Sequence, residues 1–382
     1  MTAPNIAFID LDAQQRRIEA PIRKAIDAVL KHGQYVSGPE VGRFEQMLSA
    51  HCGAKHSIGC SSGTDAIVLA LMAMNIGPGD AVFVPSFTFA ATAEAVALVG
   101  ATPVFVDCLP RTYNVDPSSL DEAVTMIKSQ GKLRPVGTIV VGMFGQAPDF
   151  NAIDPTAAKH GLWVIDDAAQ SYGASYGNRR VGTLAKVTTT SFFPAKPLGC
   201  YGDGGAIFTD DTEVAEIIRS LLVHGKGSDK YDNVRIGMNG RLDTIQAAIL
   251  IEKLKIFDEE IALRDKVYKR YNNALQKVAG VPAIVDGGTS VWAQYTINVP
   301  DRDAVAARLK AAGVPTAIYY PKPLHQQTAY RRYPVAPRGL PMSEALSQMV
   351  LSLPMHAYLD ATTQDYIVET TIKAVTQFAA GE

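Results

Sequence analysis

Short apolar runs alternate with longer helical stretches between residues 56 and 210. The apolar runs are rich in β-branched side chains and cover residues 81–85, 104–107, 138–141, 163–166, 188–193 and 206–209. Continuous apolar strands separated by helices are typical of a parallel sheet that is covered on both faces. The pattern therefore predicts an α/β fold with a large, mostly parallel sheet.

The second half of the chain changes pattern. Residues 241–278 carry a helical apolar period, which predicts one long helix, and a strand at 292–299 and a helix at 301–312 follow. A chain of 382 residues also exceeds the length of about 250 to 300 residues at which single cores stop growing. We expect a large α/β domain over residues 1–250 and a smaller C-terminal α+β domain over 251–382.

The composition excludes some classes of partner. The chain is 47% hydrophobic and 19% charged, with a net charge of −2. Nucleic acids and anionic membranes call for a basic excess, so neither is expected as a partner. No apolar stretch reaches the roughly 18 residues of a membrane span, and the N-terminus lacks the pattern of a signal peptide. The four cysteines show no metal-binding spacing and no obvious pairing, so we expect the protein to reside in a reducing cytoplasm.

One lysine is set among aromatic, apolar and rigid neighbours. Lys196 lies in the run 191–199, Ser-Phe-Phe-Pro-Ala-Lys-Pro-Leu-Gly. A desolvated lysine loses proton affinity, and its neutral amine can form a Schiff base with an aldehyde such as that of pyridoxal phosphate. Asp167, at the end of the apolar run 162–167, is the candidate carboxylate for the pyridine nitrogen of that cofactor. The alternative is a surface lysine whose stem covers apolar area.

Two further runs bear on cofactor binding. Residues 57–65 are small and hydroxyl-rich and lead into the helix-favouring run 66–74, as a phosphate site requires, although an ordinary helix N-cap has the same appearance. The glycine-rich run 199–206 precedes a strand instead of following one, which argues against a dinucleotide fingerprint. We expect its glycines to let the backbone pass close to a cofactor or to the lysine loop.

Together these runs resemble the DegT/DnrJ/EryC1/StrS family of sugar aminotransferases over nearly the full length of the chain. The matching motifs lie at residues 8–11, 33–40, 62–66, 85–89, 166–171, 191–199, 239–243 and 352–356. The resemblance implies the fold of type I pyridoxal phosphate-dependent transferases, which is similar to that of aspartate aminotransferase.

The resemblance also implies a role for individual residues. Lys196 would bind the cofactor and move the proton, and Asp167 would pair with the pyridine nitrogen. The remaining expected cofactor contacts are Gln170 near the ring or its hydroxyl, Phe89 stacked on the ring, Gly63, Thr64 and Ser191 at the phosphate, and Asn239 at the phosphate of a neighbouring subunit. A homodimer with shared active sites is therefore expected.

The expected reaction is a transamination, because family members that have His in place of the lysine catalyse dehydration. Within the family the likeness implies transfer from L-glutamate to C3 of UDP-2-acetamido-2-deoxy-3-oxo-D-glucuronate, in the synthesis of bacterial surface polysaccharide such as the O-antigen of lipopolysaccharide. Another 3- or 4-keto nucleotide sugar, or a lyase or dehydratase reaction, is the alternative.

Two residues are candidates for substrate binding. Arg241 can offer a bidentate guanidinium to the carboxylates of glutamate and the uronate, or it can brace the long helix through Asp243. His325, in the run 319–325 that resembles a substrate-side loop, can touch the sugar or nucleotide, or it can be structural.

Overall fold

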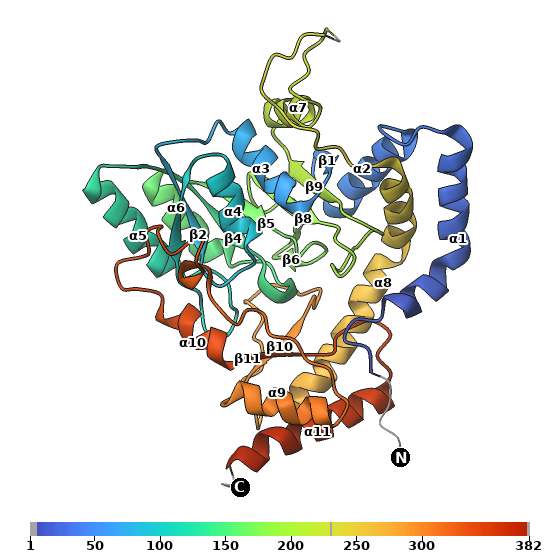
Figure 1. Ribbon diagram of the computed structural model, residues 1–382, viewed down its shortest axis with the longest axis vertical. Helices are drawn as coiled ribbons and strands as arrows, with labels where there is room; N and C mark the ends of the chain where they lie inside the picture. The colour runs from blue at the N-terminus through green and yellow to red at the C-terminus, as the bar shows by residue number, and fades with distance from the viewer. Residues whose placement is uncertain (1–5, 230, 380–382) are drawn as a thin grey trace.

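The computed structural model describes residues 6–229 and 231–379 and is built around a seven-stranded sheet (Figure 1). The strand order is β1-β9-β8-β5-β4-β2-β3. Neighbouring strands from β8 to β3 are parallel, whereas β9 is antiparallel to both β1 and β8. This confirms the expected α/β fold. The strands are β1 His56–Cys60, β2 Asp80–Pro85, β3 Thr102–Val106, β4 Arg134–Val141, β5 Trp163–Asp167, β8 Val187–Ser191 and β9 Gly205–Thr209.

Helices cover both faces of this sheet. The connections through α3 and α4 run along the sheet in one direction, and those through α5 and α6 run in the other. Since such crossovers are right-handed, the two pairs lie on opposite faces. In agreement, α3 packs on α4 and α7, and α5 packs on α6. The helices are α3 Gly63–Ala73, α4 Ala91–Leu98, α5 Pro117–Gln130, α6 Phe150–His160 and α7 Thr212–Leu221.

Some element boundaries differ from the sequence prediction. The expected loop 57–65 begins inside β1, which ends at Cys60. The strand expected to reach residue 193 ends at Ser191. Beyond it Pro194 has no N–H for a strand ladder, and the Lys196 N–H donates to the Phe193 carbonyl at 2.8 Å, which closes a turn. The lysine is therefore presented on a turn directly after the strand.

A long helix links the sheet to the C-terminal elements. The predicted helix at 241–278 is confirmed as α8, Thr244–Leu275, and α1 (Leu11–His32) and α2 (Pro39–Cys52) pack along it. The expected domain boundary near residue 250 falls inside α8, so the division into 1–250 and 251–382 stays a prediction. In Figure 1, α8 descends from the side of the sheet to the C-terminal helices at the bottom of the view.

The C-terminal elements have their own apolar cluster, which includes Tyr271, Tyr295 and Leu351. The strand expected at 292–299 is shorter, because Trp292 has a left-handed φ of 51° and the strand begins at Tyr295. Among the described residues, no helix is both long enough and apolar enough to cross a bilayer. The remaining elements are β6 Ser175–Tyr176, β7 Arg179–Arg180, β10 Tyr295–Asn298, β11 Val350–Leu353, α9 Arg302–Ala311, α10 Pro341–Met349, α11 Ala361–Ala379, and the 3-10 turns Met143–Gly145 and Leu324–Gln326.

Candidate active site

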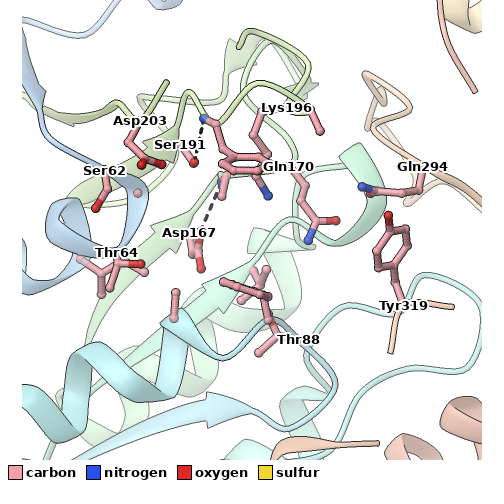
Figure 2. Close-up of a pocket in the computed structure, with 18 of the residues that line it drawn as sticks. Ser62, Thr64, Thr88, Asp167, Gln170, Ser191, Lys196, Asp203, Gln294 and Tyr319 are labelled. Atoms are coloured by element: carbon pink, nitrogen blue, oxygen red, sulfur yellow. Dashed lines mark hydrogen bonds between the residues drawn. The ribbon is translucent and has the colours of Figure 1, made fainter. Parts of the chain in front are cut away.

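A cavity of about 460 Å³ lies where β5 and β8 end, at the carboxyl edge of the parallel strands. This is the edge at which ligands of open α/β sheets bind. Figure 2 shows the side chains that converge there. The structure brings together seven of the ten residues that the sequence singled out, namely Gly63, Thr64, Phe89, Asp167, Gln170, Ser191 and Lys196.

Lys196 lies on the turn after β8 and lines the cavity (Figure 2). Burial lowers the pKa of its ammonium below the ordinary lysine value, while the charge of Asp167 acts in the opposite direction. Burial thus enlarges the fraction of neutral amine, the form that can attack an aldehyde. Its place in the cavity wall disfavours the alternative of a surface lysine whose stem covers apolar area.

Asp167 is the last residue of β5 and is buried. Burial raises the pKa of its carboxyl, and hydrogen bonds from the Thr92 hydroxyl and the Ala169 N–H, together with the charge of Lys196, act to lower it. The Thr92 oxygen lies 2.8 Å from Oδ2, and the Ala169 nitrogen lies 3.2 Å from Oδ1. Burial outweighs these contacts, so the pKa of Asp167 stays above its ordinary value, and a cation held against it in the cavity would favour its charged form.

The N-terminus of α3 forms one end of the cavity. Gly63 and Thr64 line it, and their backbone N–H groups belong to the first turn, where a helix leaves its donors without internal partners. A Cβ on Gly63 would stand 2.6 Å from the Ser191 Cβ, so only glycine lets α3 approach β8 this closely. Ser62 is also an N-cap, because its hydroxyl accepts from the Asp65 N–H at 3.0 Å. The two interpretations of this loop are thus compatible.

The glycine-rich run passes close to both halves of the site, as expected. A Cβ on Gly199 would stand 2.5 Å from the carbonyl oxygen of Pro194 in the lysine loop. A Cβ on Gly205 would stand 2.4 Å from the carbonyl oxygen of Ser62 at the start of α3. A side chain at Gly199 would therefore clash with the lysine turn, and one at Gly205 would clash with the start of α3.

Aromatic and amide side chains form the remaining walls. Phe89 is 56% exposed at the cavity and presents a free ring surface. Gln170 is buried; its Oε1 accepts from the Phe144 N–H at 2.9 Å, and its Nε2 donates to the Tyr320 hydroxyl at 3.4 Å. Tyr320 lies beside Phe89, with ring centroids 6.4 Å apart. Burial raises the pKa of Tyr320, so its phenol stays protonated.

Three predicted residues do not line this cavity. His325 donates or accepts at both ring nitrogens, with Nδ1 2.7 Å from Ser86 Oγ and Nε2 3.0 Å from a Glu344 carboxylate oxygen. This favours the structural alternative for His325. Arg241 lines a separate groove, and its Nε is buried without a partner. No ion pair joins Arg241 to Asp243, two residues that the structure describes, so the proposed brace of α8 is not seen.

Asn239 is exposed on the segment between α7 and α8, and it forms a β-bridge with Val223. It does not line the cavity of its own chain. The expected contact of Asn239 with the phosphate of a neighbouring subunit therefore stays a prediction.

The sequence did not single out several residues that contribute to the site. Thr88, Gln294, Tyr319 and Tyr320 line the cavity, and Thr92 bonds to Asp167 behind it. The two tyrosines lie in the run 319–325, in which the sequence singles out only His325. Figure 2 shows Gln294 and Tyr319 next to each other at the side of the cavity away from Thr64.

This set of residues fits pyridoxal phosphate. Lys196, whose pKa is lowered, and the buried Asp167 share one cavity. At the N-terminus of α3, Gly63 leaves space that a Cβ would fill, and the ring of Phe89 is exposed at the cavity. Lys196 would hold the aldehyde, Asp167 the ring nitrogen, and the start of α3 the phosphate.

Comparison with known proteins agrees with this chemistry. The model of the DegT/DnrJ/EryC1/StrS aminotransferase family matches residues 16–372. The chain belongs to this family. Relatives of this family that the chain resembles, such as those below, are pyridoxal phosphate-dependent sugar aminotransferases, and the protein is an enzyme of this class.

The chain is similar to several characterised or solved relatives. It is 51% identical, over 94% of its length and 97% of the relative, to the UDP-2-acetamido-2-deoxy-3-oxo-D-glucuronate aminotransferase of Pseudomonas aeruginosa. A DegT/DnrJ/EryC1/StrS aminotransferase from Brucella abortus shares 52% identity at a TM-score of 0.95, with 99% and 100% of the two chains covered. NtdA from Bacillus subtilis, solved with bound cofactor PMP, shares 31% identity at a TM-score of 0.85, with 94% and 82% covered.

Proposed function

We propose that this aminotransferase moves the amino group of L-glutamate to C3 of UDP-2-acetamido-2-deoxy-3-oxo-D-glucuronate. The observation that carries the reaction class is the single cavity that Lys196 and Asp167 share at the carboxyl ends of β5 and β8. The relative of Pseudomonas aeruginosa, which is named for this sugar, supports the substrate.

The residues of the site divide the work. Pyridoxal phosphate, when bound, supplies an aldehyde and a protonated ring that draws electrons from the substrate carbon. Lys196 Nζ would accept the proton from the α-carbon of glutamate in the first half of the reaction and would deliver a proton to C3 of the sugar in the second, a task for which a lowered pKa is suitable. Asp167 would keep a negative charge beside the ring nitrogen, and Gly63 and Thr64 would bind the phosphate.

The substrate would lie between the cofactor and the side of the cavity formed by Gln294 and Tyr319. Oε1 of Gln294 is buried without a partner and therefore available to a hydroxyl or amide of a sugar. Because Phe193 is 51% exposed at the same cavity, it can cover part of the nucleotide sugar. These side chains give the site polar and apolar contacts for a ligand larger than an amino acid.

We further propose a homodimer in which Asn239 and Arg241 of each subunit complete the site of the other. Both residues lie away from their own cavity, and the buried Arg241 Nε has no partner. The segment that precedes them exposes large apolar side chains, with Val234 53% and Ile236 90% exposed. Exposed apolar area of this kind is typical of an interface between protein chains.

A mixing experiment tests the shared site. Lys196→Ala and Arg241→Ala proteins are each expected to be inactive, but a hybrid dimer holds one site with both residues intact. Random exchange of subunits should therefore restore about a quarter of the wild-type activity. If the mixture stays inactive while native mass spectrometry shows hybrid dimers, the two residues do not serve one site across the interface.

We also propose that the enzyme works in the cytoplasm on a precursor of surface polysaccharide such as O-antigen. All four of its cysteines are unpaired and buried, as a reducing compartment allows. Loss of the gene product should shorten the polysaccharide on gels of lipopolysaccharide, and re-expression of the Lys196→Ala protein should not restore it.

The substrate assay uses the purified enzyme, pyridoxal phosphate, glutamate and a panel of UDP-linked 3-keto and 4-keto sugars. We expect release of 2-oxoglutarate in equal amount to the amino sugar, fastest with the 3-oxo-glucuronate. A preference for a 4-keto sugar would correct the substrate, and turnover without 2-oxoglutarate would replace transamination by a lyase or dehydratase reaction.

A further inference from the structure

Asp167 is held by a buried threonine that has no assigned role. Thr92 lies in the first turn of α4, is fully buried, and places its hydroxyl 2.8 Å from Oδ2 of the aspartate. The second oxygen, Oδ1, accepts from the Ala169 N–H at 3.2 Å. One donor on each oxygen fixes the plane of the carboxylate as well as its position.

A second threonine sets the direction of the hydrogen bonds. Thr88 lines the cavity, and its hydroxyl lies 3.4 Å from that of Thr92. A hydroxyl has only one proton to donate. Since Thr92 donates this proton to Asp167, Thr88 must be the donor in the bond between the threonines. The chain therefore runs from the cavity wall through Thr88 and Thr92 to the carboxylate, and every proton in it points toward Asp167.

The neighbouring acid lacks such donors. Asp166 is fully buried on the opposite side of β5, and neither of its carboxyl oxygens has a hydrogen-bond partner. Hydrogen bonds donated to a carboxylate are stronger than those donated to a neutral acid, so they favour the charged form. Of the two adjacent acids, only Asp167 has donors that stabilise its charge.

We propose that Thr92 is a positioning residue that keeps Asp167 ionised and oriented toward the ring nitrogen of the cofactor. The inference rests on the proposed function, because it assumes that Asp167 meets a cationic ring. Thr92 touches neither substrate nor cofactor; it acts only through the aspartate. Without its hydroxyl, Oδ2 would remain buried with one donor fewer, and the carboxylate would compete with the ring for the proton.

The test compares three threonine variants with the wild type. Thr92→Val keeps the shape and removes the donor, and Thr92→Ser keeps the donor. Thr188→Val is the matched control, because Thr188 is a fully buried threonine on β8 whose hydroxyl has no partner. Each protein is titrated with pyridoxal phosphate, and the visible absorbance of the bound cofactor is followed against pH.

We expect Thr92→Val to bind the cofactor about tenfold more weakly, which is the loss of one charge-assisted hydrogen bond. The pH midpoint of the visible band should rise by about one unit, because a ring with less positive charge would leave Nζ of Lys196, once joined to the cofactor, easier to protonate. In addition, kcat should fall with little change in the KM for glutamate. Thr92→Ser should restore all three values, and Thr188→Val should leave them unchanged.

Three outcomes would overturn the inference. The first is a Thr92→Val protein that has the wild-type pH midpoint. The second is a Thr92→Ser protein that is as impaired as Thr92→Val, because this would show that Thr92 acts through packing and not through its hydroxyl. If Thr92→Val does not fold, Thr92→Ala serves in its place, since it also removes the donor to Asp167. A wild-type pH midpoint in that protein is the third outcome. A wild-type protein that binds no pyridoxal phosphate would instead refute the proposed function itself.

Discussion

The buried carboxyl of Asp166 should make the protein less stable as the pH rises. Burial, and next the charge of Asp167, raise the pKa of Asp166 from 3.8 to about 8. In the unfolded chain the group loses its proton near the ordinary value, whereas the folded protein keeps the proton up to the raised one. Across this window the folded state binds more protons, so the free energy of unfolding falls with increasing pH.

The size of the effect follows from the width of the window. Each pH unit in which only the folded state keeps the proton lowers the free energy of unfolding by about 1.4 kcal/mol. Between about pH 5 and about pH 8 the sum is roughly 3 to 4 kcal/mol, and any rearrangement that lets water reach the carboxylate reduces it. This is a large share of the roughly 5 to 15 kcal/mol that stabilises a typical domain.

Asp166→Asn removes the titration and keeps the shape of the side chain. Denaturant unfolding of the variant and the wild type, at the same cofactor saturation, gives their difference in free energy of unfolding at several pH values. We expect this difference to shift in favour of the variant by about 3 kcal/mol from about pH 5 to about pH 8. Glu369→Gln, a change at an exposed position, is the control and should show no such trend. A difference that stays constant with pH would refute the protonated state of Asp166.

Three more changes test other parts of the site. Lys196→Ala should lower activity by at least about a thousandfold. Mass spectrometry after borohydride reduction should find no cofactor adduct on this variant. An adduct on another residue would show that Lys196 is not the residue that binds the cofactor. Gly63→Ala would place a Cβ 2.6 Å from the Ser191 Cβ, so cofactor binding in an absorbance titration should weaken at least about tenfold. Unchanged binding would show that the start of α3 does not hold the phosphate. His325→Phe leaves the buried Ser86 hydroxyl without the imidazole partner, so the free energy of unfolding should fall by about 1 to 3 kcal/mol while the KM values stay unchanged. A raised KM for the sugar would show that His325 does contact the substrate.

The parts of the site that the sequence predicted are those in which one local segment carries both the structure and the chemistry. Lys196, Ser191 and the glycines around them lie in one continuous run, and Gly63 and Thr64 open a helix that their own segment forms. Asp167 ends β5 and Lys196 follows β8, and because these parallel strands end at the same edge of the sheet, the α/β pattern alone brings the two residues near each other.

The residues that the sequence missed or misplaced depend on contacts between distant segments. Thr92 meets Asp167 across a separation of 75 residues, and Gln170 meets Tyr320 across 150. No local pattern distinguishes these threonine and tyrosine side chains from others of their type. His325 lies in a run that resembles a substrate-side loop, but both of its ring nitrogens are hydrogen-bonded within the protein. Their partners are Ser86 and Glu344, the second of which lies on α10.

Strand geometry explains how two identical neighbours acquire opposite environments. Successive side chains on β5 point to opposite faces, so Asp167 meets α4 and the cavity while Asp166 enters the apolar side of the sheet. A slip of β5 by one residue would exchange the two acids, but it would also exchange Val164 and Ile165, both of which are buried in the core of the sheet. The packing of these two apolar residues and the parallel pairing with β4 and β8 therefore fix which aspartate receives the donors. The register of β5 thus places Asp167, which ends the apolar run, and not its buried neighbour Asp166, at the cavity.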